Sequence, residues 1–79
     1  MQPNPTTMIL SFHQREIIDA RLNELIRRAV VADEHGRHRE CERLNDRHDA
    51  LFIAAAHLDE GTADAADLRL VCDALEINL

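Results

Sequence analysis

The stretch from residue 41 to residue 58 constrains the fold more than any other part of the chain. Apolar or weakly polar residues recur in it at steps of three and four: Cys41, Leu44, His48, Leu51, Ala55 and Leu58. A helix places positions with this spacing on one continuous stripe. Phe52 widens the stripe, and charged residues fill the other faces. Because an isolated helix of this length is marginal in water, the pattern predicts an amphipathic helix packed against another surface.

A second stripe with the same spacing precedes the first. It consists of Ile18, Leu22, Leu25, Ala29 and Ala32, with Ile26 and Val30 beside it. On the outer face, the spacing of four predicts ion pairs of Arg15 with Asp19 and of Glu24 with Arg28. Ser11 stands three residues before Gln14, which is the spacing of a capping box and predicts a helix start near Phe12. Residues 33–40 contain no apolar residue but include Gly36, which favours a turn between antiparallel helices. One continuous helix through this stretch is the alternative.

The clearest boundary in the chain is Gly61-Thr62. Glycine suits the left-handed position after a helix, and threonine can cap the next helix. Asp64 and Asp67 favour the N-terminal end of that helix, where the helix dipole attracts negative charge. The apolar residues that follow lie on two sides: Leu68, Val71, Cys72, Leu75 and Leu79 on one, and Leu70, Ala74 and Ile77 on the other. This is more apolar surface than one hairpin groove can cover.

These patterns predict a single all-α domain, an antiparallel helical hairpin followed by a third, C-terminal helix. The predicted helices span residues 11–34, 38–60 and 62–78, and residues 1–10, with two prolines, form a flexible or extended lead-in. A chain of 79 residues has room for only a small core, so we expect a homodimer that forms a dimeric helical bundle. The sequence does not show which apolar face forms the contact between the two copies.

Composition and charge disfavour several classes of partner. The net charge of −6 argues against general binding to nucleic-acid phosphates or anionic membranes. The chain has no Trp or Tyr and only two Phe, which leaves little material for stacking on bases. It also lacks a signal-peptide pattern and any apolar stretch of membrane-spanning length. Cys41 and Cys72 lie on apolar helix faces, as packed thiols do in a reducing compartment. We predict a cytoplasmic protein without membrane contact.

No catalytic or nucleotide-binding signature is present in the sequence. His35, His38 and Cys41 recur every three residues, but three candidates spread across a predicted turn are too few for a zinc site. Cys41 and His48 are two helical turns apart, about 10 Å, which is too far for a nucleophile and its base. We therefore predict no enzymatic activity, no metal and no cofactor.

The arginines of the second predicted helix form the most distinctive polar pattern. Arg39, Arg43 and Arg47 repeat every four residues, as in a helix that contacts phosphates. Acidic residues stand between them and would repel the same phosphates, which makes nucleic acid an unlikely partner. Binding hot spots in protein interfaces favour arginine and large apolar side chains. The predicted partner-binding residues are Arg39, Arg43, Arg47, Leu70 and Ile77.

The last part of the chain carries a resemblance. The stretch from Gly61-Thr62 through Asp67 to Asp73-Ala74-Leu75 resembles the C-terminal pattern of small uncharacterised proteins from phages and mobile elements of GC-rich proteobacteria. It covers about a quarter of the chain, and the exclusive use of arginine as basic residue fits a GC-rich coding genome. The resemblance implies a small protein that disables or redirects a host protein. We expect a protein-interaction module that inhibits or modulates another protein; a small DNA-associated transcriptional regulator is the first alternative and a structural subunit the second.

Overall fold

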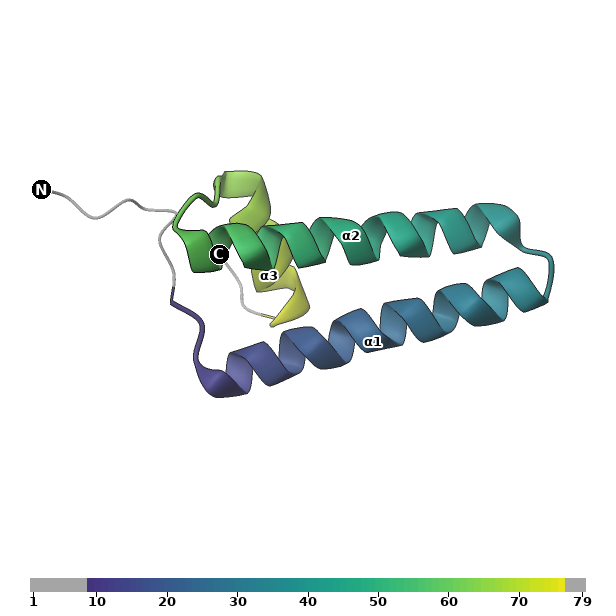
Figure 1. The fold of residues 1–79 in the computed structure, drawn as a ribbon, viewed down its shortest axis with the longest axis horizontal. Helices are drawn as coiled ribbons and strands as arrows, with labels where there is room; N and C mark the ends of the chain where they lie inside the picture. Colours follow the sequence, from purple (N-terminus) through teal and green to yellow (C-terminus); the bar gives the residue numbers. More distant parts are fainter. Residues whose placement is uncertain (1–8, 77–79) are drawn as a thin grey trace, which may run out of the picture.

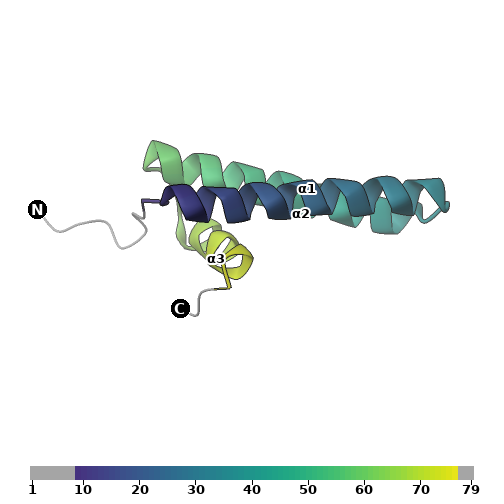
Figure 2. The same ribbon diagram turned by 90° about the horizontal axis from the view of Figure 1, so that it is seen from below.

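The described part of the chain folds into three helices. The computed structural model describes residues 9–76, which contain α1 (Phe12–Glu34), α2 (His38–Glu60) and α3 (Ala65–Ala74). Helices α1 and α2 lie side by side as an antiparallel hairpin, and α3 lies across one side of it near the open end (Figures 1 and 2). The predicted all-α hairpin with a third helix is confirmed.

Helix α1 begins at the capping box that the sequence predicts. The Ser11 hydroxyl accepts a hydrogen bond from the Gln14 backbone N–H at 3.1 Å, and the Gln14 side chain accepts one from the Ser11 N–H at 2.9 Å. Each bond satisfies a backbone donor that has no partner inside the helix. The start of α1 is thus fixed by these two residues.

The hairpin turn is built around Gly36, which has a φ of 72°. The Gly36 N–H donates to the Asp33 carbonyl at 3.0 Å, and the Arg37 N–H donates to the Ala32 carbonyl at 2.8 Å. This pair of bonds closes the last turn of α1 around a left-handed residue. Helix α2 then starts at His38, so the predicted turn within residues 33–40 is present, at residues 35–37, and the helix is not continuous.

Helix α2 ends in the same way at Gly61, whose φ is 75°. The Gly61 N–H donates to Leu58 O at 3.2 Å, and the Thr62 N–H donates to His57 O at 2.8 Å. The Thr62 hydroxyl also donates to His57 O, at 3.5 Å, so this side chain belongs to the end of α2 and does not cap the next helix.

Asp64 takes that capping role instead. Its carboxylate accepts a bond from the Asp67 N–H at 2.8 Å, and the Asp67 carboxylate accepts one from the Asp64 N–H at 3.2 Å. The third helix therefore begins at Ala65, three residues after the predicted start. It ends at Ala74, since Glu76 adopts a left-handed φ of 58°. The predicted end at residue 78 lies outside the described residues.

The core falls into two clusters along the hairpin. The cluster near the open end consists of Leu10, Ile18, Leu22, Leu51, Ala54, Leu58, Ala63 and Val71. The cluster near the turn consists of Leu25, Ala29, Ala32 and Leu44, with Cys41 partly buried against it. All five stripe residues predicted for α1 are buried. In α2 the stripe residue Ala55 is partly buried against this core, and its neighbour Ala54, outside the predicted stripe, is fully buried because α2 packs against α3 as well as α1.

Helix α3 buries most of its apolar side chains against the open-end cluster. Val71 and Cys72 are buried, and Leu68, Ala74 and Leu75 are partly buried. Leu70 is 39% exposed. Ile77 and Leu79, which the sequence also assigns to this helix, lie outside the described residues. Within residues 65–76, the apolar surface left uncovered is thus smaller than the sequence predicts.

Two arginines of α1 form ion pairs that differ from those predicted by a spacing of four residues. Arg15 binds Asp59 of α2, with its Nη1 2.9 Å from Oδ2, in place of the expected partner Asp19 four residues on. Glu24 pairs with Arg21 at 3.3 Å and not with the expected Arg28. The Arg15 contact bridges the first turn of α1 and the last turn of α2, which are neighbours only in the folded hairpin.

Candidate functional site

Helix α3 covers only part of one side of the hairpin. Figure 2 shows it against the open end, with the side of the hairpin beyond it, toward the turn at residues 35–37, left bare by the described elements. We call residues 9–20 and 50–76 the open half and residues 21–49 the turn half. The bare side of the turn half carries an open hollow of about 580 Å³, lined by Arg28, Glu40, Arg43, Leu44, Asp46 and Arg47. We call this hollow the arginine surface.

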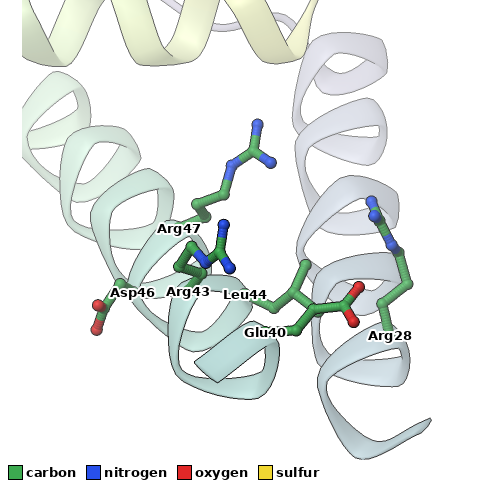
Figure 3. A pocket seen from close by; sticks show the side chains of 6 residues that line it. All are labelled: Arg28, Glu40, Arg43, Leu44, Asp46 and Arg47. Carbon is green, nitrogen blue, oxygen red and sulfur yellow. The ribbon is translucent and has the colours of Figure 1, made fainter. Parts of the chain in front are cut away.

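Both helices of the hairpin contribute arginines to this surface. Arg43 and Arg47 lie one turn apart on α2, and Arg28 stands across from them on α1 (Figure 3). Leu44, 4% exposed, belongs to the turn-end core cluster and forms the apolar floor. Antiparallel packing of α1 and α2 therefore brings together cations that are far apart in the sequence.

These arginines have few carboxylates to compensate them. Among residues 9–76, no carboxylate oxygen lies within 4.0 Å of the guanidinium group of Arg28, Arg43 or Arg47. Glu40, in the same lining, pairs with Arg37 at 3.3 Å, and Asp46 points away from the hollow (Figure 3). Guanidinium groups that are exposed and unpaired can donate in pairs to a carboxylate or phosphate.

A second hollow continues the surface toward α3. It has a volume of about 280 Å³ and lies between the hairpin and α3, and Arg47 and Asp46 line both hollows. Leu70 and Asp73 of α3 line its far side. The arginine surface therefore adjoins a partly exposed leucine, so cationic and apolar contacts are available side by side.

The predicted partner-binding residues are distributed unevenly over this geometry. Arg43 and Arg47 line the arginine surface, and Leu70 lines the adjoining hollow. Arg39 is exposed on α2 but does not line either hollow. Ile77 lies outside the described residues.

Arg28 was not among the predicted binding residues, because its spacing from Glu24 predicts an ion pair on the same helix. The register of the hairpin is the signal that identifies Arg28 as a neighbour of the α2 arginines. In an antiparallel hairpin that turns at Gly36, residues equally far from the turn face each other, which puts Arg28 opposite the stretch that begins at Leu44.

The two halves differ sharply in charge. The turn half contains seven arginines and seven acidic residues, whereas the rest of the chain contains two arginines and eight acidic residues. The whole net charge of −6 therefore belongs to the open half. The arginine surface is a cationic site at the neutral end of an otherwise acidic molecule.

Charged groups of the open half are engaged in contacts between helix ends. His57 Nδ1 lies 2.8 Å from Asp67 Oδ2, and this hydrogen bond raises the pKa of His57 and lowers the pKa of Asp67. The Asp64 N–H lowers the pKa of Asp67 further. The Arg15 guanidinium lowers the pKa of Asp59 by its hydrogen bond. These groups hold α1, α2 and α3 together at the open end, so their role is structural.

The residues considered for metal chemistry do not converge. His35 and His38 are exposed, Cys41 is half-buried, and His38 lies 3.4 Å from Asp33. Within the described part of the chain, no group of three or more His, Cys, Asp or Glu residues is placed to hold a metal ion. Cys72 is buried in the core, away from Cys41.

The helices formed by residues 12–74 include none that is both long and apolar enough to cross a membrane.

Comparison with protein-family models, with curated proteins and with solved structures finds no match. Among residues 9–76, the arginine surface combines exposed guanidinium groups with an apolar floor.

Proposed function

We propose that this protein is a non-enzymatic interaction module that binds another protein through the arginine surface and Leu70, and so inhibits or modulates it. The observation that carries the proposal is a set of three arginines around the apolar floor at Leu44: Arg28, Arg43 and Arg47, which have no carboxylate partner in the described part of the chain. Arginine is enriched in protein interfaces and dominates binding hot spots, because it combines planar donors with an apolar stem.

The surface indicates the chemistry of the partner. Three cationic groups next to Leu70 suit a segment that presents carboxylates beside a large apolar side chain. We place this binding in the cytoplasm and include in the proposal a host protein as partner and a phage or mobile element as the source of the chain. The lack of Trp and Tyr and the net negative charge also agree with a protein partner.

Alanine substitution tests the proposal. Full-length tagged protein is used to capture partners from lysate of the source cell, the captured protein is identified by mass spectrometry, and its affinity is then measured with purified components. Arg43→Ala and Arg47→Ala should each weaken binding at least tenfold, or about 1.4 kcal/mol. Arg28→Ala should act in the same direction.

Arg39→Ala is the matched control, because it removes the same charge from an exposed position of the same helix outside the hollow. It should change the affinity less than twofold, about 0.4 kcal/mol. Full retention of affinity in all three surface variants, with circular dichroism showing an intact fold, would contradict the proposal.

A DNA-associated regulator is the second candidate, because the same three arginines could contact backbone phosphates. The seven acidic residues of the turn half and the net charge of −6 oppose it. A mobility-shift titration with duplex DNA at rising salt separates the two. Affinity for DNA that falls steeply with salt and is lost in Arg43→Ala but not in Arg39→Ala would favour the regulator.

A further inference from the structure

The chain itself contains a helix with the chemistry that the arginine surface suits. Residues 64–76, which include α3, carry four acidic side chains, Asp64, Asp67, Asp73 and Glu76, and one arginine, Arg69. Asp73 is exposed, and Leu70, 39% exposed, lies beside it at the edge of the second hollow. Helix α3 therefore presents carboxylate and leucine side by side.

The bare side of the hairpin has room for another helix. Helices of 23 residues are about 34 Å long, whereas a helix that lies across them occupies about 10 Å of that length. Figure 2 shows α3 almost end-on against the open half, so it crosses the hairpin and leaves the turn half uncovered. A second helix of the same kind could lie next to α3 over the arginine surface.

We infer that a second copy of this chain supplies that helix. Two copies face each other through the side that carries α3, in opposite directions, so that α3 of each copy lies on the arginine surface of the other. Such a twofold arrangement is closed, because the same two patches meet twice. We infer further, resting on the proposed function, that self-association and partner binding compete for the arginine surface.

Charge complementarity selects this arrangement. The open half carries the whole net charge of −6, and the turn half carries the three arginines that have no carboxylate partner among residues 9–76. These arginines lie on the side of the hairpin that carries α3, since Arg47 also lines the hollow next to Leu70. When the two hairpins point in opposite directions, the acidic half of each copy lies over the arginines of the other. Parallel hairpins would instead place the two acidic halves together. Like charges brought together in an interface are costly, so the antiparallel pair is favoured.

Sedimentation equilibrium over a range of protein concentration tests the self-association. Wild-type protein should form a dimer at low salt, and its dissociation constant should rise at least tenfold at high salt because exposed charges are screened. Arg43→Glu should raise the dissociation constant at least tenfold, while Arg39→Glu, with the same charge change outside the hollow, should alter it less than threefold. A monomeric wild type at low salt, or equal effects of the two variants, would overturn the inference.

Mixing two variants tests whether α3 is the occupant. Asp73→Arg should weaken self-association as Arg43→Glu does, because each change places like charges in both of the symmetric contacts. An equimolar mixture should recover a heterodimer, since the reversed charges meet in one contact and the native charges in the other. Failure of the mixture to associate more tightly than either variant alone would show that α3 is not the occupant.

Competition is tested with Asp73→Asn, which weakens self-association without adding a positive charge. This variant should bind the captured partner more tightly than wild type at protein concentrations where wild type is dimeric. Unchanged partner affinity in a variant that has become monomeric would overturn the competition. The proposed function fails on a different result, the retention of partner binding in Arg43→Ala and Arg47→Ala.

Discussion

The open half and the turn half are built from the same two helices, yet their charged side chains make different contacts. In the open half α3 adds a third packed element, and the ion pair of Arg15 with Asp59 and the hydrogen bond between His57 and Asp67 join the helix ends. In the turn half no third element covers the hairpin within the described residues, and three arginines face an open hollow. The difference shows that the placement of α3 decides which side of the hairpin stays open to solvent.

The two glycine-terminated helix ends make the contrast sharper. Gly36 and Gly61 have nearly equal φ angles, 72° and 75°, and each closes its helix with the same pair of backbone hydrogen bonds. Helix α2 starts two residues after Gly36, whereas α3 starts four residues after Gly61. One local motif therefore leads once to an antiparallel neighbour and once to a crossing helix, depending on where the next helix is capped.

The largest expected effect concerns the two core clusters. Leu51→Ala removes a buried side chain that lies in the open-end cluster with Val71 of α3, and should lower the free energy of unfolding by about 3 to 5 kcal/mol. Leu44→Ala removes the floor of an open hollow, where neighbouring side chains can relax. It should therefore lower the free energy of unfolding by less, about 2 to 3 kcal/mol. Urea denaturation at one fixed protein concentration measures both. A larger loss of unfolding free energy for Leu44→Ala than for Leu51→Ala would contradict the expected difference between the two clusters.

The next effect concerns the glycines. Gly36→Ala and Gly61→Ala should each cost about 1 to 2 kcal/mol, because a side chain disfavours the left-handed conformation. An added Cβ meets no atom within 4 Å at either site, so the cost is conformational and should be equal at both. Thermal and urea unfolding of the two variants provide the measurement. A clearly larger loss at Gly61 would mean that its conformation also controls the docking of α3.

The capping boxes should have a smaller effect. Asp64→Ala and Ser11→Ala each remove an acceptor for a backbone N–H and should destabilise the protein by about 1 kcal/mol. Amide hydrogen exchange shows where the loss occurs: Asp64→Ala should speed exchange mainly in α3, and Ser11→Ala mainly in the first turn of α1. Equal acceleration throughout the chain after either change would show that α3 and the hairpin unfold only as one unit.

The smallest expected effect is a pH dependence at the open end. The pKa of His57 is raised above its ordinary value of 6.5 by Asp67, so the charged pair stabilises the fold below about pH 6.5, and this stabilisation is lost as the pH rises through the raised pKa. The pKa of Asp67 is lowered from 3.8, so its contribution is present above that value and is lost as the pH falls through the lowered pKa.

The free energy of unfolding should therefore fall with rising pH, from slightly acid to slightly alkaline, more in wild type than in His57→Gln. His13→Gln, a change at an exposed histidine of α1, is the control and should keep the wild-type slope. A wild-type slope that His57→Gln leaves intact would show that the His57 and Asp67 pair does not contribute to the pH dependence.

The sequence predicted the helical elements because their signals are local. Apolar spacing placed the buried stripe of α1 correctly, and Ser11 with Gln14 marked its start. Gly36 and Gly61 marked the ends of α1 and α2, since a left-handed residue is a property of the backbone at one position. The start of α3 was placed three residues early because two residues could cap it. Thr62 is used by the end of α2, and this leaves Asp64 for α3.

The candidate site was predicted only in part, for the opposite reason. Arg43 and Arg47 share one helix face, so their spacing alone revealed them. Arg28 joins them across the hairpin, and Glu24, expected to pair with Arg28, pairs with Arg21. By itself the sequence determined the helices, their ends and their apolar stripes, because these depend on neighbours within a few residues. The tertiary structure alone decided that α3 crosses the open half, that Arg15 binds Asp59, and that three arginines share a bare surface, because each depends on the register of antiparallel helices.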